Sequence, residues 1–334
     1  MTTTYNEEVI EEMRTGIQSI LHEWNLPADS EVSLLNISEN ATFIAKPPTE
    51  GDSVILRVHR PDYHTRQEIE SELLWVDSLR TQGIVSTAEP LDIQSGGKIS
   101  SLPNGGEERL VVGFEFLAGQ EPAPENDLRQ DFFTLGAVTA KLHDHTKSWA
   151  IPIGFKRKVW DFNSMLGATP LWGDWREAIG LEPKGKAILG ETAELLEQQL
   201  ESYGKDKSKF GLIHADLRLA NLLVDGEQLS VIDFDDCGYS WLMYDFAAAI
   251  SFMEEDEQIP KLQKSWVEGY RSESYLAEED EAALPMFVML RRILLTAWLA
   301  SHSETETAQE LGAGYTEGTI RLAENYLAHY TTKN

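Results

Sequence analysis

The sequence predicts a two-lobed α+β fold, with an antiparallel β-sheet in a small N-terminal lobe and mostly helices in a larger C-terminal lobe. Strand-like runs are concentrated before residue 117, and helical periodicity dominates after it. A block of strands and polar loops at residues 210–236 interrupts the helices. Because 334 residues can form two bodies with separate cores, we divide the chain into lobes of residues 1–117 and 118–334.

The N-terminal lobe is predicted to contain two helices and a small sheet. The expected elements are an amphipathic helix over residues 6–24, two strands within 32–45 around a turn at 37–40, a strand over 54–59, a helix over 65–82, a Gly-, Ser- and Pro-rich hairpin loop over 92–108, and a strand over 110–117. The turn at 37–40 contains no glycine, and neither G-x-G-x-x-G nor a Walker A sequence occurs in the chain.

The C-terminal lobe is predicted to begin with a long helix that ends at His143 and His145. We interpret these two histidines as helix-end side chains that interact with the helix dipole. Residues 150–185 are rich in Trp, and they either line a substrate cleft or form a packed loop. Further helices are expected over residues 186–203 and towards the C-terminus.

The block at residues 210–236 contains a short apolar run, a polar loop and two strands separated by Asp225-Gly226. This dipeptide predicts a tight hairpin, because a two-residue turn needs residues that tolerate positive φ. Folding the hairpin brings its outer ends together, so that Asn221 at one end approaches Asp233 at the other. Asp216 lies on the loop that precedes the first strand. Such oxygen-bearing side chains suit a hard cation, and we predict Mg²⁺.

The spacing of these residues follows a known catalytic pattern. His214, Asp216 and Asn221 form H-x-D-x-x-x-x-N, and Asp233 follows after two short strands in Ile-Asp-Phe-Asp-Asp. Kinases place a catalytic-loop Asp, a metal-binding Asn and a second metal-binding Asp in this order. The stretch resembles the aminoglycoside phosphotransferase and choline kinase-like family, which includes homoserine kinases and bacterial stress-response kinases. This resemblance implies a protein-kinase-like fold, with a nucleotide-binding N-terminal lobe and a catalytic, substrate-binding C-terminal lobe.

The resemblance also implies roles for individual residues. Asp216 would accept or orient the proton of the acceptor hydroxyl, Asn221 and Asp233 would hold Mg²⁺, and Asp235 would face the substrate. Arg57 occupies the position of the phosphate-binding Lys of kinases and would pair with Glu72, although Glu68 lies one turn away on the same helix. The remaining candidates for ATP binding are Ser38 and Asn40 in the turn, and the backbone near Glu115 and Leu117.

Composition limits the possible partners. A formal net charge of −28 argues against nucleic acid and anionic lipid, which are bound through Lys and Arg, and mildly favours a cationic or neutral partner. Neither a basic, apolar signal sequence nor an apolar run of about 20 residues is present. One cysteine fits a reducing cytoplasm. We therefore expect a cytoplasmic monomer or homodimer without membrane association.

The predicted function is an ATP- and Mg²⁺-dependent transfer of a phosphoryl group to the hydroxyl of a small molecule. Homoserine-like, choline-like and sugar-like acceptors, as well as an aminoglycoside, all fit this chemistry. The alternatives are a Ser/Thr protein kinase of the bacterial stress-response type and a nucleotide-binding regulator without catalysis. The intact set of Asp216, Asn221 and Asp233 argues against the regulator, whereas Arg57 and the glycine-free turn favour it.

Overall fold

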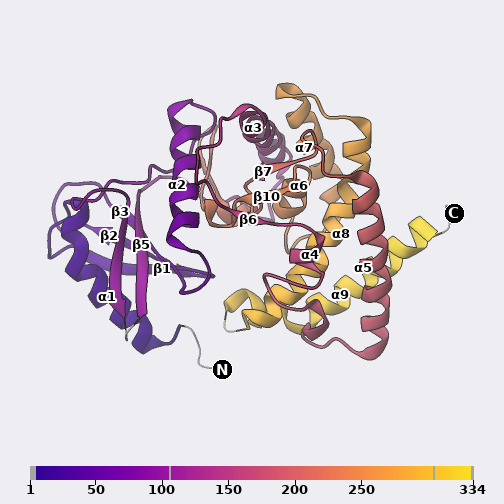
Figure 1. Cartoon of the computed structure of the whole chain (residues 1–334), viewed down its shortest axis with the longest axis horizontal. Helices are drawn as coiled ribbons and strands as arrows, with labels where there is room; N and C mark the ends of the chain where they lie inside the picture. Colours follow the sequence, from indigo (N-terminus) through magenta and orange to yellow (C-terminus); the bar gives the residue numbers. More distant parts are fainter. Residues whose placement is uncertain (1–4, 105–106, 304, 332–334) are drawn as a thin grey trace. The chain divides into compact units, whose positions relative to one another are not determined.

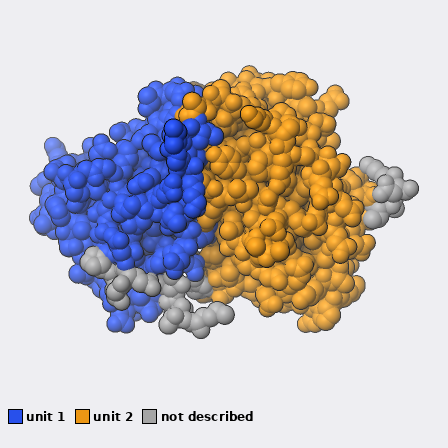
Figure 2. Space-filling view, viewed as in Figure 1, with its two compact units in different colours: residues 1–119, 151–156 blue, residues 120–150, 157–334 orange. Residues whose placement is uncertain are grey.

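A computed structural model describes residues 5–104, 107–303 and 305–331 of the chain. The described chain divides into two compact units, shown in blue and orange in Figure 2. The first unit comprises residues 1–119 and 151–156, and the second comprises residues 120–150 and 157–334. The short segment 151–156 belongs with the first unit although the chain has by then entered the second.

The first unit contains a five-stranded sheet with the strand order β1-β2-β3-β5-β4. Figure 1 labels four of these strands, β1, β2, β3 and β5. Every neighbouring pair in it is antiparallel, as the sequence predicts. Its elements are α1 (Glu7–Ile20), a 3₁₀ turn (Leu21–Trp24), β1 (Glu31–Ile37), β2 (Ala41–Lys46), β3 (Val54–Val58), α2 (Arg66–Thr81), β4 (Ile99–Asn104) and β5 (Glu107–Glu115). The predicted loop over residues 92–108 is wrong in part, because β4 lies inside it and pairs with β5; residues 105–106 lie outside the described residues.

Helices α1 and α2 pack against different sets of sheet residues. Met13 and Ile17 of α1 share a core with Leu56 of β3 and Val111 of β5. Ile69 and Leu73 of α2 pack instead with Ile99 and Val112. Because successive side chains of a strand point to opposite faces, Arg57 lies on the face opposite Leu56, towards α2. The alternation of side-chain directions along β3 therefore decides which helix can supply a partner for Arg57.

The second unit is mostly helical, with two small sheets. Its elements are α3 (Arg129–Ser148), β6 (Lys158–Val159), α4 (Phe162–Met165), α5 (Pro183–Tyr203), β7 (Phe210–Ile213), β8 (Leu222–Asp225), β9 (Gln228–Val231), β10 (Gly238–Trp241), α6 (Tyr244–Ala249), α7 (Ile259–Glu273), α8 (Glu278–Ser301) and α9 (Glu306–Thr331), with 3₁₀ turns at Trp175–Glu177, Leu219–Asn221 and Phe234–Asp236. One sheet has the order β6-β10-β7, and the other is the β8-β9 hairpin.

The hairpin has the predicted form. Leu222 pairs with Val231 and Asp225 pairs with Gln228, which leaves a two-residue turn. Gly226 in this turn has φ of +61°, the conformation for which glycine is favoured. At the open end the N–H of Ile232 donates to the carbonyl of Asn221 at 2.9 Å. The backbone is thus closed between the two positions that the sequence places together.

Helix α8 forms part of the core of the second unit. It is the one helix of the described chain that is long and apolar enough to cross a membrane, and 78% of its apolar window is buried inside the fold. The burial extends to Arg291 and Arg292, which are each 2% exposed. Its apolar character is therefore accounted for by packing within the protein.

Candidate active site

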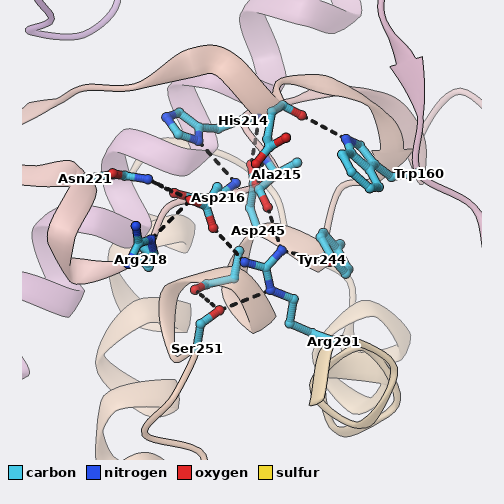
Figure 3. Close-up of polar contacts among 12 residues, drawn as sticks. Trp160, His214, Ala215, Asp216, Arg218, Asn221, Tyr244, Asp245, Ser251 and Arg291 are labelled. Carbon is cyan, nitrogen blue, oxygen red and sulfur yellow. Dashed lines mark hydrogen bonds and ion pairs between the residues drawn. The ribbon is translucent and has the colours of Figure 1, made fainter. Parts of the chain in front are cut away.

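The loop after β7 is held by a buried carboxylate at the start of α6 (Figure 3). Asp245 Oδ1 accepts the N–H of Ala215 at 2.7 Å, and Oδ2 accepts the N–H of His214 at 3.4 Å. Ala215 has φ of +69°, an uncommon value for a residue with a Cβ. Two hydrogen bonds to a fully buried carboxylate thus stabilise a backbone shape that the chain alone disfavours.

Asp245 is in turn fixed by the helix pair α3 and α7. His143 Nε2 lies 3.1 Å from Asp245 Oδ2, and His143 Nδ1 lies 3.1 Å from the Tyr270 hydroxyl. His143 is completely buried, so its interpretation as a helix-end side chain is wrong. The spacing of the two histidines on the helix gave no sign of this role, because the partners come from residues 245 and 270.

His214 connects this loop to the segment after the hairpin. Its Nδ1 accepts the N–H of Asp216 at 3.2 Å, so that Nε2 carries the proton and donates to the carbonyl of Ile232 at 3.1 Å. The imidazole also packs against the Phe234 ring, with 4.5 Å between the ring centroids. These contacts fix the backbone on both sides of Asp233.

Asp216 is surrounded by hydrogen-bond donors. Its Oδ2 accepts Nδ2 of Asn221 at 2.8 Å and Nε of Arg218 at 3.3 Å. Its Oδ1 accepts Nη2 of Arg291 at 2.6 Å. Burial by itself raises the pKa of Asp216, but the charges of Arg218 and Arg291 outweigh it and hold the pKa below the ordinary value. The carboxylate is therefore ionised and held in one orientation.

Asn221 and Asp233 stand at the open end of the hairpin. The Asn221 amide donates to both the carbonyl and the carboxylate of Asp216, which leaves its Oδ1 as the group able to act as a ligand. Asp233 is exposed and has φ of +59°. No group of three or more His, Cys, Asp or Glu side chains poised for a metal occurs among the described residues. A donor set of one amide and one carboxylate oxygen fits Mg²⁺, which retains waters and substrate phosphates as its other ligands.

Buried contacts from residues 157–160 fix the segment that follows Asp233. Arg157 donates to the carbonyls of Asp235 and Cys237, and Trp160 Nε1 donates to the carbonyl of Asp236 at 2.8 Å. The Asp235 side chain is only 5% exposed. Trp160, Trp172 and Trp175 are also buried, so these tryptophans of the segment 150–185 form packed structure.

In the first unit, Arg57 and Glu72 form the predicted ion pair. Nη2 of Arg57 lies 2.7 Å from both carboxylate oxygens of Glu72, and both side chains are buried. Glu68 has a different role, because it completes a capping box with Thr65 at the start of α2. Partial burial raises the pKa of Glu68, but the hydrogen bonds from Thr65 lower it below the ordinary value. The geometry thus distinguishes the two glutamates, while a phosphate-binding role for Arg57 stays a prediction.

The other predicted ATP contacts lie at the ends of strands in the first unit. Ser38 N–H donates to the carbonyl of Asn40 in the β1–β2 turn, and Asn40 Oδ1 accepts the N–H of Arg60 at 3.1 Å. The Asn40 side chain therefore links the turn to the backbone after β3. The N–H of Glu115 donates to the carbonyl of Glu89, so this residue would offer adenine only its carbonyl. Leu117 follows the end of β5 and is half-buried.

Arg291 is a site residue that the sequence motifs do not predict. It lies on α8, 75 positions from Asp216 along the chain, and it reaches the carboxylate at 2.6 Å. In the sequence it stands in the apolar run MLRRILLTAW, where a pair of arginines gives no indication of an active-site contact. A run of apolar residues around two cations does indicate buried cations that need partners, but it does not identify those partners.

Comparisons with known proteins show the family of the chain. A family profile described as "Phosphotransferase enzyme family" matches residues 33–284. A solved structure titled as a microcompartment-associated aminopropanol kinase is 44% identical, with a TM-score of 0.87, and the match covers 94% of this chain and 98% of that one.

Two further similarities concern amicoumacin kinases. The amicoumacin kinase of Bacillus subtilis (strain 168) is 24% identical over 335 residues, which is 94% of this chain and 96% of that protein. The structure of amicoumacin kinase hAmiN, solved with AMP-PNP, Ca²⁺ and Ami, is 22% identical with a TM-score of 0.75, and the match covers 95% of this chain and 94% of that one. The profile spans most of this chain, and the 44% identical structure is that of a kinase. The chain is an enzyme with a kinase-like fold, and it belongs to the phosphotransferase enzyme family.

Proposed function

We propose that this enzyme transfers the γ-phosphoryl group of ATP to the hydroxyl of a small amino alcohol. The observation that carries the proposal is the Asp216–Asn221 contact on a loop held by Asp245, in a chain 44% identical to a structure titled as an aminopropanol kinase. The formal net charge of −28 also favours the approach of a cationic amine.

In the proposed reaction the acceptor oxygen forms a bond to the γ-phosphorus, and the bond between that phosphorus and the β–γ bridging oxygen breaks. The electron pair of the broken bond stays on ADP. The hydroxyl proton passes to Asp216 and then to solvent. Positioning and charge neutralisation provide most of the rate in such transfers, so few side chains need to react covalently.

The other predicted residues have roles in this scheme. Asn221 and Asp233 would hold Mg²⁺, which when bound neutralises charge on the transferred phosphate. Arg57, fixed by Glu72, would bind phosphate oxygens through its planar guanidinium. Asp235 would face the acceptor, Ser38 and Asn40 would lie near the phosphates, and the backbone at Glu115 and Leu117 would contact adenine.

The decisive experiment measures ADP release by the purified chain with Mg²⁺ and ATP. The acceptors are 1-amino-2-propanol, ethanolamine, homoserine, choline, a hexose and a protein substrate, with propylamine and 2-propanol as controls that lack one functional group. We expect turnover with small amino alcohols and none with either control. Turnover with the hexose or the protein but with no amino alcohol would overturn the proposal.

Two variants test the assigned residues in the same assay. We expect Asp216→Asn to lower kcat by at least about 10²-fold, the lower range for loss of a general base.

Asp233→Ala should abolish Mg²⁺- and ATP-dependent turnover while the melting temperature stays close to that of the native chain, because Asp233 is exposed. Undiminished turnover in the Asp233→Ala variant would refute its assignment as a metal ligand.

A further inference from the structure

Helix α8 carries two consecutive buried arginines whose side chains reach different clusters. Arg292 binds Glu254, Glu255 and Thr319, and its guanidinium lies over the Tyr315 ring. Arg291 is directed to the catalytic loop instead, where it meets Asp216 (Figure 3). The two arginines have the same exposure and neighbouring positions on one helix. They differ in whether their partner is the proposed catalytic residue.

The guanidinium of Arg291 is fixed by several acceptors besides Asp216. Nε donates to the Ser251 hydroxyl at 3.1 Å, and Nη1 donates to the Tyr244 hydroxyl at 3.0 Å and to the Ala215 carbonyl at 3.3 Å. Its cationic centre lies 5.1 Å from the centroid of the Trp172 ring. The planar guanidinium group therefore has one available orientation, and a lysine ammonium at this position could not make all of these contacts.

The two oxygens of Asp216 are not equivalent. Each carboxylate oxygen has about two acceptor positions. Within the described part of the chain, Oδ2 receives two donors, from Asn221 and Arg218, whereas Oδ1 receives one, from Arg291. Oδ1 therefore keeps one acceptor position for an incoming hydroxyl, and its direction is set by the bond to Arg291.

We propose that Arg291 is a positioning residue for phosphoryl transfer, which fixes Oδ1 of Asp216 as the atom that receives the acceptor hydroxyl. This inference rests on the proposed function, since it assumes that Asp216 binds the acceptor. Arg291 acts through Asp216 and need not touch ATP or the acceptor itself. A displacement of about 1 Å in a reacting group can cost about 10²-fold in rate, so loss of this contact should lower kcat strongly.

The alternative is that Arg291 is a buried ion-pair partner that only stabilises the fold. Both interpretations predict that replacing Arg291 lowers stability, because the largely buried carboxylate of Asp216 loses one of its two arginine partners. They differ in the kinetics of the folded variant. A stabilising role leaves kcat of the folded fraction unchanged, whereas a positioning role lowers kcat with little change in KM.

The experiment compares Arg291→Lys with its neighbour Arg292→Lys. For each variant we measure kcat, KM for ATP, KM for 1-amino-2-propanol and the thermal melting temperature. We expect Arg291→Lys to lower kcat by about 10- to 100-fold with both KM values within about threefold of native. Arg292→Lys should lower the melting temperature and keep kcat of the folded protein within about threefold of native.

If Arg291→Lys does not fold, the variants Tyr244→Phe and Ser251→Ala test the inference instead. Each removes one acceptor of the Arg291 guanidinium and leaves Asp216 itself intact. We expect each to lower kcat by about two- to fivefold without a matching change in KM. Native kcat in both of these variants, or native kcat in a folded Arg291→Lys variant, would overturn the inference.

Failure of the inference is distinguishable from failure of the proposed function. If the proposed function is wrong, the native chain shows no turnover with amino alcohols or Asp216→Asn retains full activity. If only the inference is wrong, the native chain is active and Asp216→Asn is impaired, while Arg291→Lys and Arg292→Lys have the same native kcat.

Discussion

The ion pair between Arg57 and Glu72 lies buried in the first unit, and under the proposed function it also fixes Arg57 for phosphate binding. Both side chains are buried, so removing one charge takes the 2.7 Å ionic contact away from the other in a poorly solvated environment. We expect Glu72→Gln to lower the free energy of unfolding by about 3 kcal/mol, the lower end for breaking a buried pair. If Arg57 binds phosphate, the same variant should also raise KM for ATP. Urea unfolding and steady-state kinetics measure the two effects.

Glu68 provides the matched control on the same helix. It caps the start of α2, and Gln can also complete a capping box. Glu68→Gln should therefore lower the free energy of unfolding by less than about 1 kcal/mol. KM for ATP should stay at the native value. Equal losses of stability in the Glu68 and Glu72 variants would contradict the assignment of Glu72 as the partner of Arg57.

At the level of elements, the pair α3 and α7 positions the residues behind the catalytic loop. Each helix contributes a glycine to the contact: a Cβ at Gly136 would lie 2.0 Å from the carbonyl oxygen of Trp266, and one at Gly269 would lie 1.9 Å from that of Phe133. Backbone atoms cannot shift as a flexible side chain does. The two helices therefore approach closely only because both positions lack a side chain.

We expect Gly136→Ala to destabilise the protein by about 1–3 kcal/mol through overpacking, even though Ala favours helix formation. Since α3 carries His143 and α7 carries Tyr270, kcat should fall as well. Thermal unfolding and steady-state kinetics measure both changes.

Gly190 in α5 is the control for this substitution. A Cβ there would lie 3.9 Å from Trp175, an ordinary contact. Gly190→Ala should therefore leave stability unchanged or raise it by up to about 1 kcal/mol. A Gly136→Ala variant as stable as Gly190→Ala would show that the helices can separate without cost.

The hairpin could be predicted from local sequence patterns, whereas contacts between residues far apart in the chain could not. Asp225-Gly226 between two short apolar runs predicts the turn, and the turn in turn places Asn221 opposite Ile232, because register in a hairpin follows from the turn. The contact of His143 with Asp245 spans 102 positions, and no periodicity in either segment encodes it. β4 was missed because its sequence, ISSLPN, lies in a Gly-, Ser- and Pro-rich region that is typical of loops.

At the scale of the whole chain, the candidate site draws on segments far apart in the sequence. Contacts to its loop come from α6 and α8 of the second unit, and α3 supports the carboxylate on α6. The preceding segment 157–160 fixes the backbone after Asp233. The family profile ends at residue 284, before Arg291. A search with this profile would therefore cover Asp216 and Asn221 and would overlook Arg291, which contacts Asp216.

Burial of tyrosines across both units predicts an alkaline limit to stability. Burial raises the pKa of Tyr5 in the first unit and of Tyr244 in the second to about 12, and it raises those of Tyr270 and Tyr315 as well. In the unfolded chain tyrosine ionises near pH 10, with a pKa of about 10. Above this pH the unfolded chain releases protons that the folded chain retains, so the unfolded state gains stability.

The stabilising contribution of these tyrosines should therefore be fully present below about pH 10. Above this pH, the free energy of unfolding should fall by up to about 1.4 kcal/mol per pH unit for each of them. Urea unfolding at fixed ionic strength between pH 8 and 11, followed together with tyrosinate absorbance, measures this slope. Tyr5→Phe should cost about 1 kcal/mol at neutral pH, since the bond from its hydroxyl to the Glu39 carbonyl is lost, yet it should reduce the alkaline slope. Ionisation of these tyrosines near pH 10 in the still-folded protein would contradict their burial as the cause.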